Sequence, residues 1–231
     1  MISSAGTRKI HNSLNLVVGI QIMIWLITGC YMVLMDINFI RGQHLIAPTQ
    51  TAVIAADTVK VQPADIQSRL GPISSFRLLA HPSGPAYLVN QNERSLLISA
   101  VDGRTLPETL NRNQAIEAAL ARFNGAGEPI TAALLETPPD EVSWITPPVW
   151  QVSFTGVGQP RLYLNAQTGE LISKRHDYWQ VFDLFWMLHI MDYDTRENIH
   201  NPLLQIAASL ALISALSGIV LLWVSRRRRP L

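Results

Sequence analysis

Two long runs of apolar residues lie near the ends of the chain. Residues 14–35 and 202–224 contain no charged side chain, and each is as long as the roughly 20 residues that a helix needs to cross about 30 Å of hydrocarbon. A helix also pairs its backbone polar groups internally, as lipid requires. The pattern predicts two transmembrane helices. The first run is too long for a typical signal peptide and has no cleavage site after it, which favours a permanent anchor.

Between these runs the apolar pattern becomes short and alternating. Stretches such as "PAYLVN", "SLLISA", "VWQVSFT" and "PRLYLN" have a period of two and are separated by turn sequences such as "VDGR" and "AQTGE". This alternation predicts antiparallel hairpins. Residues 63–71 and 113–121 have the spacing of short amphipathic helices. The middle of the chain is therefore predicted to be α+β.

The middle also contains an internal repeat. The two short helices align at an offset of 50 residues, which pairs Ile66 with Ile116, and the later turns align at an offset of 66, which pairs Gly103 with Gly169. The second copy thus has 66 − 50 = 16 additional residues, and the proline-rich segment 137–148 is the expected place for them. Each copy predicts one helix packed on a small sheet.

Charge is distributed unevenly along the chain. The net charge is only +1, but all 17 acidic residues lie between Asp36 and Glu197, while Arg8, Lys9 and the arginines at 226–229 flank the apolar runs. Basic flanks stay on the cytoplasmic side. We therefore expect a bacterial inner-membrane protein with both termini in the cytoplasm and the middle in the periplasm. The basic tails do not indicate binding to nucleic acid.

Several stretches together resemble a known family. The turn and strand "NAQTGELI" at 165–172, its weaker echo "SAVDGRTL" at 99–106, and the segments "RKIHNSLNLVVG" and "FWMLHIMDYDTRENIHNPLL" beside the apolar runs resemble PepSY-domain proteins with PepSY-associated transmembrane helices. The resemblance covers nearly the whole chain. The layout that we predict is a cytoplasmic tail 1–13, a span 14–35, PepSY-like repeats 60–106 and 112–176, an interfacial segment 178–200, a span 202–224 and a basic tail 225–231.

The resemblance also implies a candidate cofactor. Larger relatives usually have four or more spans and are associated with iron uptake, and some are haem-containing reductases of ferric chelates. A membrane haem b needs two axial histidines at one depth. The candidate ligands are His11, His189, His44 and His200. More than about 20 Å of helix separates His11 from His189, so an axial pair within one chain would join His189 to His44 or His200, while His11 would need a second copy or a partner. For each histidine, the alternative is an interfacial or loop residue without a cofactor.

The sequence lacks the motifs of common enzymes. It contains no nucleotide fingerprint, no nucleophile elbow and no zinc motif, and we predict neither catalytic residues nor a metal site. The acidic residues of "MDYDTREN" are explained by a helix N-terminus on the periplasmic side, with a cation site as the alternative.

Two functions follow from these observations. The leading hypothesis is a non-catalytic accessory or inhibitory module that binds a periplasmic or membrane protein, or a second copy of itself, by adding a strand to a sheet edge. Trp144 and Trp150 are its candidate anchors, and both have a place in the core as the alternative. The second hypothesis is a haem b electron-transfer subunit linked to iron uptake.

Overall fold

The computed structural model describes the backbone of residues 4–48, 53–92 and 94–227, and the side chains of residues 15–48, 53–92 and 94–219. The chain forms two compact units. The helical unit comprises residues 1–37 and 180–231, and the α+β unit comprises residues 38–179. The fold is α+β, with an apolar helix near each end and two antiparallel sheets between them, as the sequence predicts.

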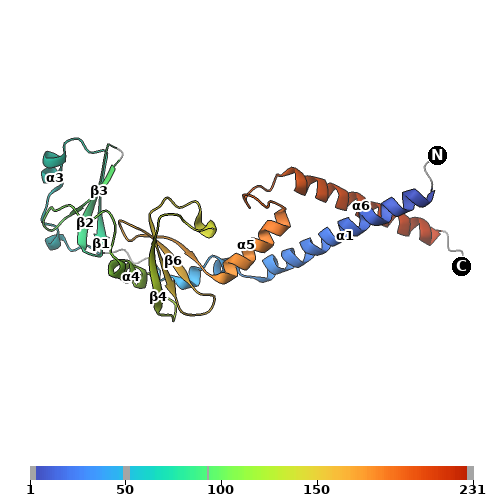
Figure 1. Ribbon diagram of the computed structural model, residues 1–231, viewed down its shortest axis with the longest axis horizontal. Coiled ribbons are helices and arrows are strands. Elements are labelled where there is room, and N and C mark those ends of the chain that lie inside the picture. The colour runs from blue at the N-terminus through green and yellow to red at the C-terminus, as the bar shows by residue number, and fades with distance from the viewer. Residues whose placement is uncertain (1–3, 49–52, 93, 228–231) are drawn as a thin grey trace. The chain divides into compact units, whose positions relative to one another are not determined.

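The helical unit contains the two apolar helices. They are α1 (Ser4–Leu34) and α6 (Pro202–Arg227), drawn in blue and red in Figure 1. Both are long and apolar enough to cross a membrane, with mean hydropathies of 2.1 over residues 15–34 and 1.8 over residues 202–219. They contact each other through polar side chains, because the Ser214 hydroxyl donates to Asn15 Oδ1 at 3.0 Å. The third helix is α5 (Asp177–Ile190).

The α+β unit consists of two similar halves, each made of one helix and one antiparallel sheet. The first half contains α3 (Pro63–Leu70), β1 (Ser75–His81), β2 (Gly84–Gln91) and β3 (Arg94–Ser99). The second contains α4 (Arg112–Leu120), β4 (Pro129–Leu135), β5 (Val149–Phe154), β6 (Arg161–Asn165) and β7 (Leu171–Arg175). Short helices α2 (Ile37–Ile40), η1 (Gln43–Leu45), η2 (Ala56–Thr58) and η3 (Asp140–Val142) complete the described elements. Within each sheet the strands follow chain order.

The two halves use the same backbone hydrogen bonds. Gly103 and Gly169 have φ angles of +74° and +75°, and each N–H donates to the carbonyl four residues earlier, on Ser99 and Asn165. An L-residue seldom adopts this left-handed conformation, which explains glycine at both turns. The alignment of the two glycines at an offset of 66 is therefore confirmed.

The segment that leads into each helix is also held in the same way. The Val61 N–H donates to the Ala100 carbonyl at 3.0 Å, and the Leu110 N–H donates to the Ala166 carbonyl at 2.7 Å. Both alanines are buried. This bond attaches the start of each helix to the end of the third strand of its sheet.

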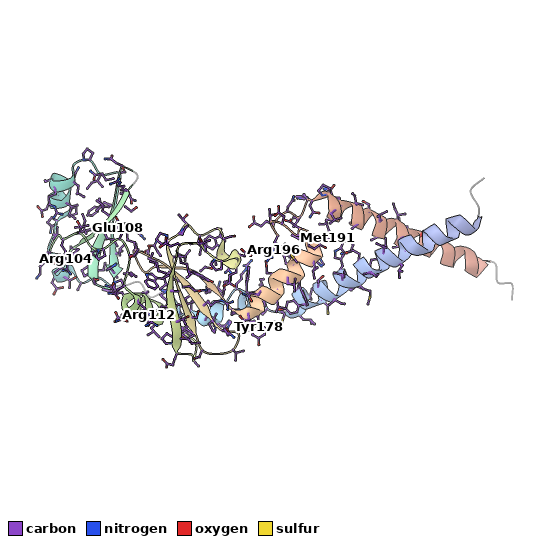
Figure 2. All side chains as sticks on the ribbon, in the orientation of Figure 1. Arg104, Glu108, Arg112, Tyr178, Met191 and Arg196 are labelled. Atoms are coloured by element: carbon purple, nitrogen blue, oxygen red, sulfur yellow. The ribbon has the colours of Figure 1, made fainter. Side chains whose placement is uncertain are left out.

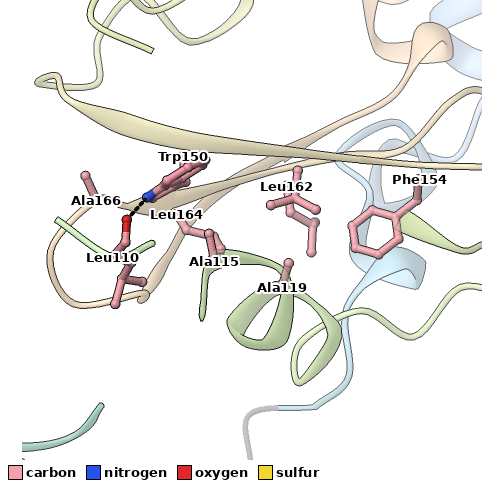
Figure 3. Close-up of a cluster of buried hydrophobic side chains, with 9 residues drawn as sticks. Leu110, Ala115, Ala119, Trp150, Phe154, Leu162, Leu164 and Ala166 are labelled. Carbon is pink, nitrogen blue, oxygen red and sulfur yellow. Dashed lines mark hydrogen bonds between the residues drawn. The ribbon is translucent and has the colours of Figure 1, made fainter. Parts of the chain in front are cut away.

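The helices themselves align at an offset of 49, so the predicted pairing at 50 was wrong by one residue. Capping boxes begin at Gln62 and Asn111, and the fully buried Ile66 corresponds to Ala115 rather than to Ile116. The physical reason is volume. Large side chains from β5 and β6 fill the second core, as Figure 3 shows, and only small residues on α4 leave room for them.

An aromatic donor occupies the same position in both halves. The Tyr87 hydroxyl donates to the Val61 carbonyl at 2.9 Å, and Trp150 Nε1 donates to the Leu110 carbonyl at 3.1 Å (Figure 3). Both donors lie on the second strand of their sheet and bond to the residue just before the helix cap. Trp150 is therefore a structural counterpart of Tyr87.

His176 joins the first and last segments of the α+β unit. Its side chain is almost completely buried, and its Nε2 atom lies 2.9 Å from the Phe39 carbonyl oxygen. The Phe39 ring stacks on the His44 ring at 4.6 Å, and the His44 and His176 rings are 5.6 Å apart. Gly42, with φ +67°, allows the chain to pass close to His176.

We expect the Trp150→Phe substitution to lower the free energy of unfolding by about 2 kcal/mol, because a buried hydrogen bond and part of a core side chain are lost. Tyr87→Phe removes only the hydrogen bond and should cost about 1 kcal/mol. The matched control is Trp144→Phe, whose tryptophan is 63% exposed and should change stability by less than about 0.5 kcal/mol. Urea unfolding of the full chain in detergent, followed by circular dichroism, measures all three. Equal effects at 144 and 150 would contradict this account.

We also expect the α+β unit to lose stability in acid. Burial lowers the pKa of His176 below its ordinary value of 6.5, and the nearby His44 and Arg161 act in the same direction; burial lowers the pKa of His81 as well. Below the ordinary pKa of histidine, the unfolded chain therefore binds more protons than the folded chain. The full stability is present above that ordinary pKa and is lost as the pH falls through the lower pKa of the folded state.

The measurement is the difference in midpoint temperature between about pH 7.5 and about pH 5.5. It should shrink in His176→Gln, whose amide can still donate to Phe39, and should persist in the control His200→Gln, which alters an exposed loop residue. An unchanged difference in His176→Gln would show that another group senses the pH.

Candidate functional site

His189 near the end of α5 is held against α1 by a short chain of hydrogen bonds. The Thr28 hydroxyl donates to the Ile24 carbonyl at 2.7 Å and lies 2.9 Å from His189 Nδ1. A hydroxyl has only one hydrogen to donate, so Thr28 can donate to the Ile24 carbonyl in the tautomer whose Nδ1–H donates to the hydroxyl. The neutral ring then has its lone pair on Nε2, which is the form in which histidine binds a metal.

Other α1 side chains fix the position of this histidine. Trp25 Nε1 donates to the His189 carbonyl at 2.8 Å, and a Cβ atom on Gly29 would lie 3.4 Å from the His189 ring. One turn further along, the rings of Tyr31 and Phe185 meet edge to face at 4.8 Å. His189 is thus a preorganised imidazole on the side of a membrane helix.

The loop from Met191 to Asn201 is organised around the carboxylate of Asp192. This side chain accepts the Thr195 hydroxyl at 2.6 Å and four backbone N–H groups, from residues 194, 195, 197 and 198. The Thr195 hydroxyl and these N–H groups lower the pKa of Asp192 well below its usual value. Asp192 is therefore a structural residue, which explains the position of one acidic residue in this segment without a bound cation.

The same loop folds back onto α5. Figure 2 labels Met191 and Arg196, the two loop residues with positive φ angles of +54° and +59°. The Arg196 guanidinium pairs with Asp183, and its carbonyl accepts the Trp186 indole N–H at 2.9 Å. Asn201 donates to the Ile190 carbonyl at 2.9 Å and caps α6 by accepting the Leu204 N–H. Among residues with described side chains, no cluster of three metal-binding side chains occurs.

The other predicted haem ligands belong to other segments of the chain. His44 belongs to the α+β unit and is exposed, and His200 is exposed on the loop. The His11 side chain lies outside the described side chains, and its backbone is 17 residues, or about 26 Å of helix, from Thr28. Among the described side chains of the helical unit, His189 is the histidine that a neighbouring helix holds in place. Haem ligation by these residues stays a prediction.

The two predicted anchors of a protein partner occupy different environments. Trp144 is 63% exposed in the segment after η3, whereas Trp150 is 7% exposed and lies in the core of the second half. Partner binding by these residues stays a prediction. Of the two, Trp144 is the one with a solvent-exposed side chain.

Sequence reasoning missed the residues that hold His189 and the loop. Thr28 and Trp25 are isolated polar groups in an apolar run, where a polar atom requires a partner, and this was the available signal. The role of Asp192 was also missed, although an aspartate followed by Tyr-Asp-Thr-Arg-Glu-Asn is typical of a side chain that accepts hydrogen bonds from its own loop.

Comparison with known proteins agrees with this architecture. The family model described as "PepSY-associated TM region" matches residues 8–231, which is essentially the whole chain. No significant match was found among the curated proteins or among the solved structures compared. With both apolar helices and the two sheets accounted for, the chain belongs to the family of the PepSY-associated transmembrane region.

Proposed function

We propose that this chain is a non-catalytic, membrane-anchored PepSY module that binds an extended segment of a protein partner along the open edge of β1. It would act as an accessory or inhibitory subunit for a periplasmic or membrane protein. The basic residues that flank both apolar helices support an inner-membrane location with cytoplasmic termini and a periplasmic α+β unit.

The observation that carries this proposal is the state of the β1 edge. Strand β1 pairs with β2 over all seven residues without a bulge, and in the described part of the chain no strand or bridge pairs with its second edge. The edges of the other sheet are less regular, because β4 begins at Pro129 with a register shift and β7 is short and also shifted. Long, regular, unprotected edges are the ones that accept an added strand.

Side chains on β1 favour an apolar partner strand. Phe76 and Leu78 are 36% and 38% exposed on the same face of the strand, beside the Tyr87 ring, which lies 4.5 Å from that of Phe76. On the other face, Arg77 forms two hydrogen bonds with Glu170 at 2.8 and 2.9 Å. An added strand would cover Phe76 and Leu78 with its own alternate side chains and leave the Arg77 pair intact.

The hairpin shows which backbone groups are available. Two residues connect His81 to Gly84, so this closing pair exchanges its hydrogen bonds across the strands. Alternation along β1 then directs the N–H and carbonyl groups of Phe76, Leu78 and Ala80 away from β2. These are the groups that a partner strand would bond.

A second function, haem b electron transfer, is favoured by the state of His189. In the tautomer whose Nδ1–H donates to Thr28, its Nε2 atom carries the lone pair. Haem would supply one-electron chemistry. A second axial ligand would have to come from another copy of the chain or from a partner.

We expect a photo-crosslinking residue at the exposed Ala80 to form a discrete protein adduct when the full chain is made in bacterial membranes. Leu78→Pro should abolish the adduct, because proline removes an outward N–H from the edge. Leu78→Val should retain it, because only the side chain changes. An adduct that survives Leu78→Pro would contradict binding at this edge.

The same membrane preparations distinguish the second function. Under haem-replete growth, the proposal expects no Soret band that copurifies in proportion to the chain. A stoichiometric bis-histidine spectrum that is lost in His189→Ala, together with no adduct at Ala80, would replace the binding module by the electron-transfer subunit.

A further inference from the structure

Contacts within the helical unit indicate at which residues the membrane surface crosses it. Three contacts place α5 along α1: Trp25 bonds the His189 carbonyl, Thr28 bonds the His189 ring, and Tyr31 meets Phe185. Later residues of α5 contact earlier residues of α1, so the two helices run in opposite directions. The end of α5 therefore lies beside residues 25–28 of α1, and not beside Leu34.

The start of α6 lies at the same level. Asn201, the cap of α6, bonds the carbonyl of Ile190, the last residue of α5. Thirteen residues further along α6, Ser214 bonds Asn15. Because Thr28 is also 13 residues from Asn15, the two helices run antiparallel with residue 201 close to the level of residue 28.

The loop between α5 and α6 cannot lie in hydrocarbon. Asp194, Glu197, Asn198 and His200 are exposed in it, and its backbone is irregular. Exposed charges and irregular backbone are excluded from the lipid-facing hydrocarbon region. The apolar stretch of α1, however, continues to Leu34, six residues beyond Thr28.

We propose that the hydrocarbon core ends near Thr28 on this side, and that residues 29–35 of α1 and the α5 residues from Gln180 onward form a two-helix collar that binds phospholipid at headgroup level. Eighteen residues counted back from residue 27 of α1 reach Ile10, just inside Arg8 and Lys9, and 20 residues counted along α6 from Pro202 reach Leu221. Both helices then cross the same thickness of about 30 Å, with basic residues at its far side.

The composition of the collar fits the interfacial layer of a bilayer. Phe182, Phe185 and Trp186 on α5 are aromatic residues of the kind that concentrates at the membrane interface. Val33, Leu34 and Leu184 are apolar and exposed, which water alone would not stabilise. Seven residues of helix rise about 10 Å, enough to span a headgroup layer of about 5–8 Å. Phospholipid is the occupant that the adjoining spans place within reach.

The native Cys30, the single cysteine of the chain, lies in the collar and is exposed. The test labels it with a nitrobenzoxadiazole fluorophore on the full chain, reconstituted in phosphatidylcholine vesicles that contain a nitroxide either on the headgroup or deep on the acyl chain. We expect the headgroup nitroxide to quench the fluorescence more strongly. The same order is expected for Leu184→Cys in a Cys30→Ser background.

Two control positions in that background calibrate the experiment. Ser209→Cys, exposed in the middle of α6, should be quenched more by the deep nitroxide, and Asn198→Cys in the loop should be quenched by aqueous iodide. Stronger quenching of labelled Cys30 by the deep nitroxide would put residue 30 in hydrocarbon and overturn the proposal. Quenching of Cys30 by neither nitroxide, with both controls behaving as expected, would mean that protein covers the collar, and would overturn it too.

Discussion

The helical unit depends on one carboxylate, which lets the chain reverse direction beside a membrane without leaving backbone groups unpaired. Between α5 and α6, Asp192 accepts four backbone N–H groups and one hydroxyl. This side chain thus replaces the hydrogen bonds that a helix would have supplied to the same N–H groups. The result is a compact loop that ends at the α6 cap. The position at which α6 begins beside the end of α5 follows from it.

The α+β unit repeats one scheme with different side chains. In each half, one residue before the helix makes two bonds. Its carbonyl accepts an aromatic N–H or O–H from the second strand, and its own N–H donates to a carbonyl at the end of the third strand. The backbone scheme is kept, while isoleucine on one helix is replaced by alanine on the other. Volume explains the exchange, because a bulkier set of side chains on the second sheet needs a smaller helix face. The halves therefore share hydrogen bonds more closely than they share sequence.

These particulars show which features a sequence can reveal. The spans, the hairpins and the glycine turns were predictable because each is a local property of composition or of backbone conformation. The buried face of α4 was not, because Ile116 and Leu120 look more apolar than Ala115 and Ala119, and only the facing sheet decides that small residues are buried. The role of Trp150 was likewise decided by Leu110, 40 residues away. Thr28 and Asp192 needed the fold to reveal which atoms they contact.

The extent of the first span illustrates the same limit, and it bears on function. By hydropathy alone the span extends to Leu34. The depth of α1 in the membrane is also limited by the charged loop packed beside it, because that loop must stay outside the hydrocarbon. Holding the exposed acidic residues of that loop in hydrocarbon would be unfavourable, by up to about 2.5–3.5 kcal/mol for each of them at the bilayer centre. His189 then lies at the membrane surface rather than within the bilayer. At that depth the imidazoles of His189 and of the exposed His200 both lie on the water side of the hydrocarbon, so a haem held by either of them would sit at the membrane surface.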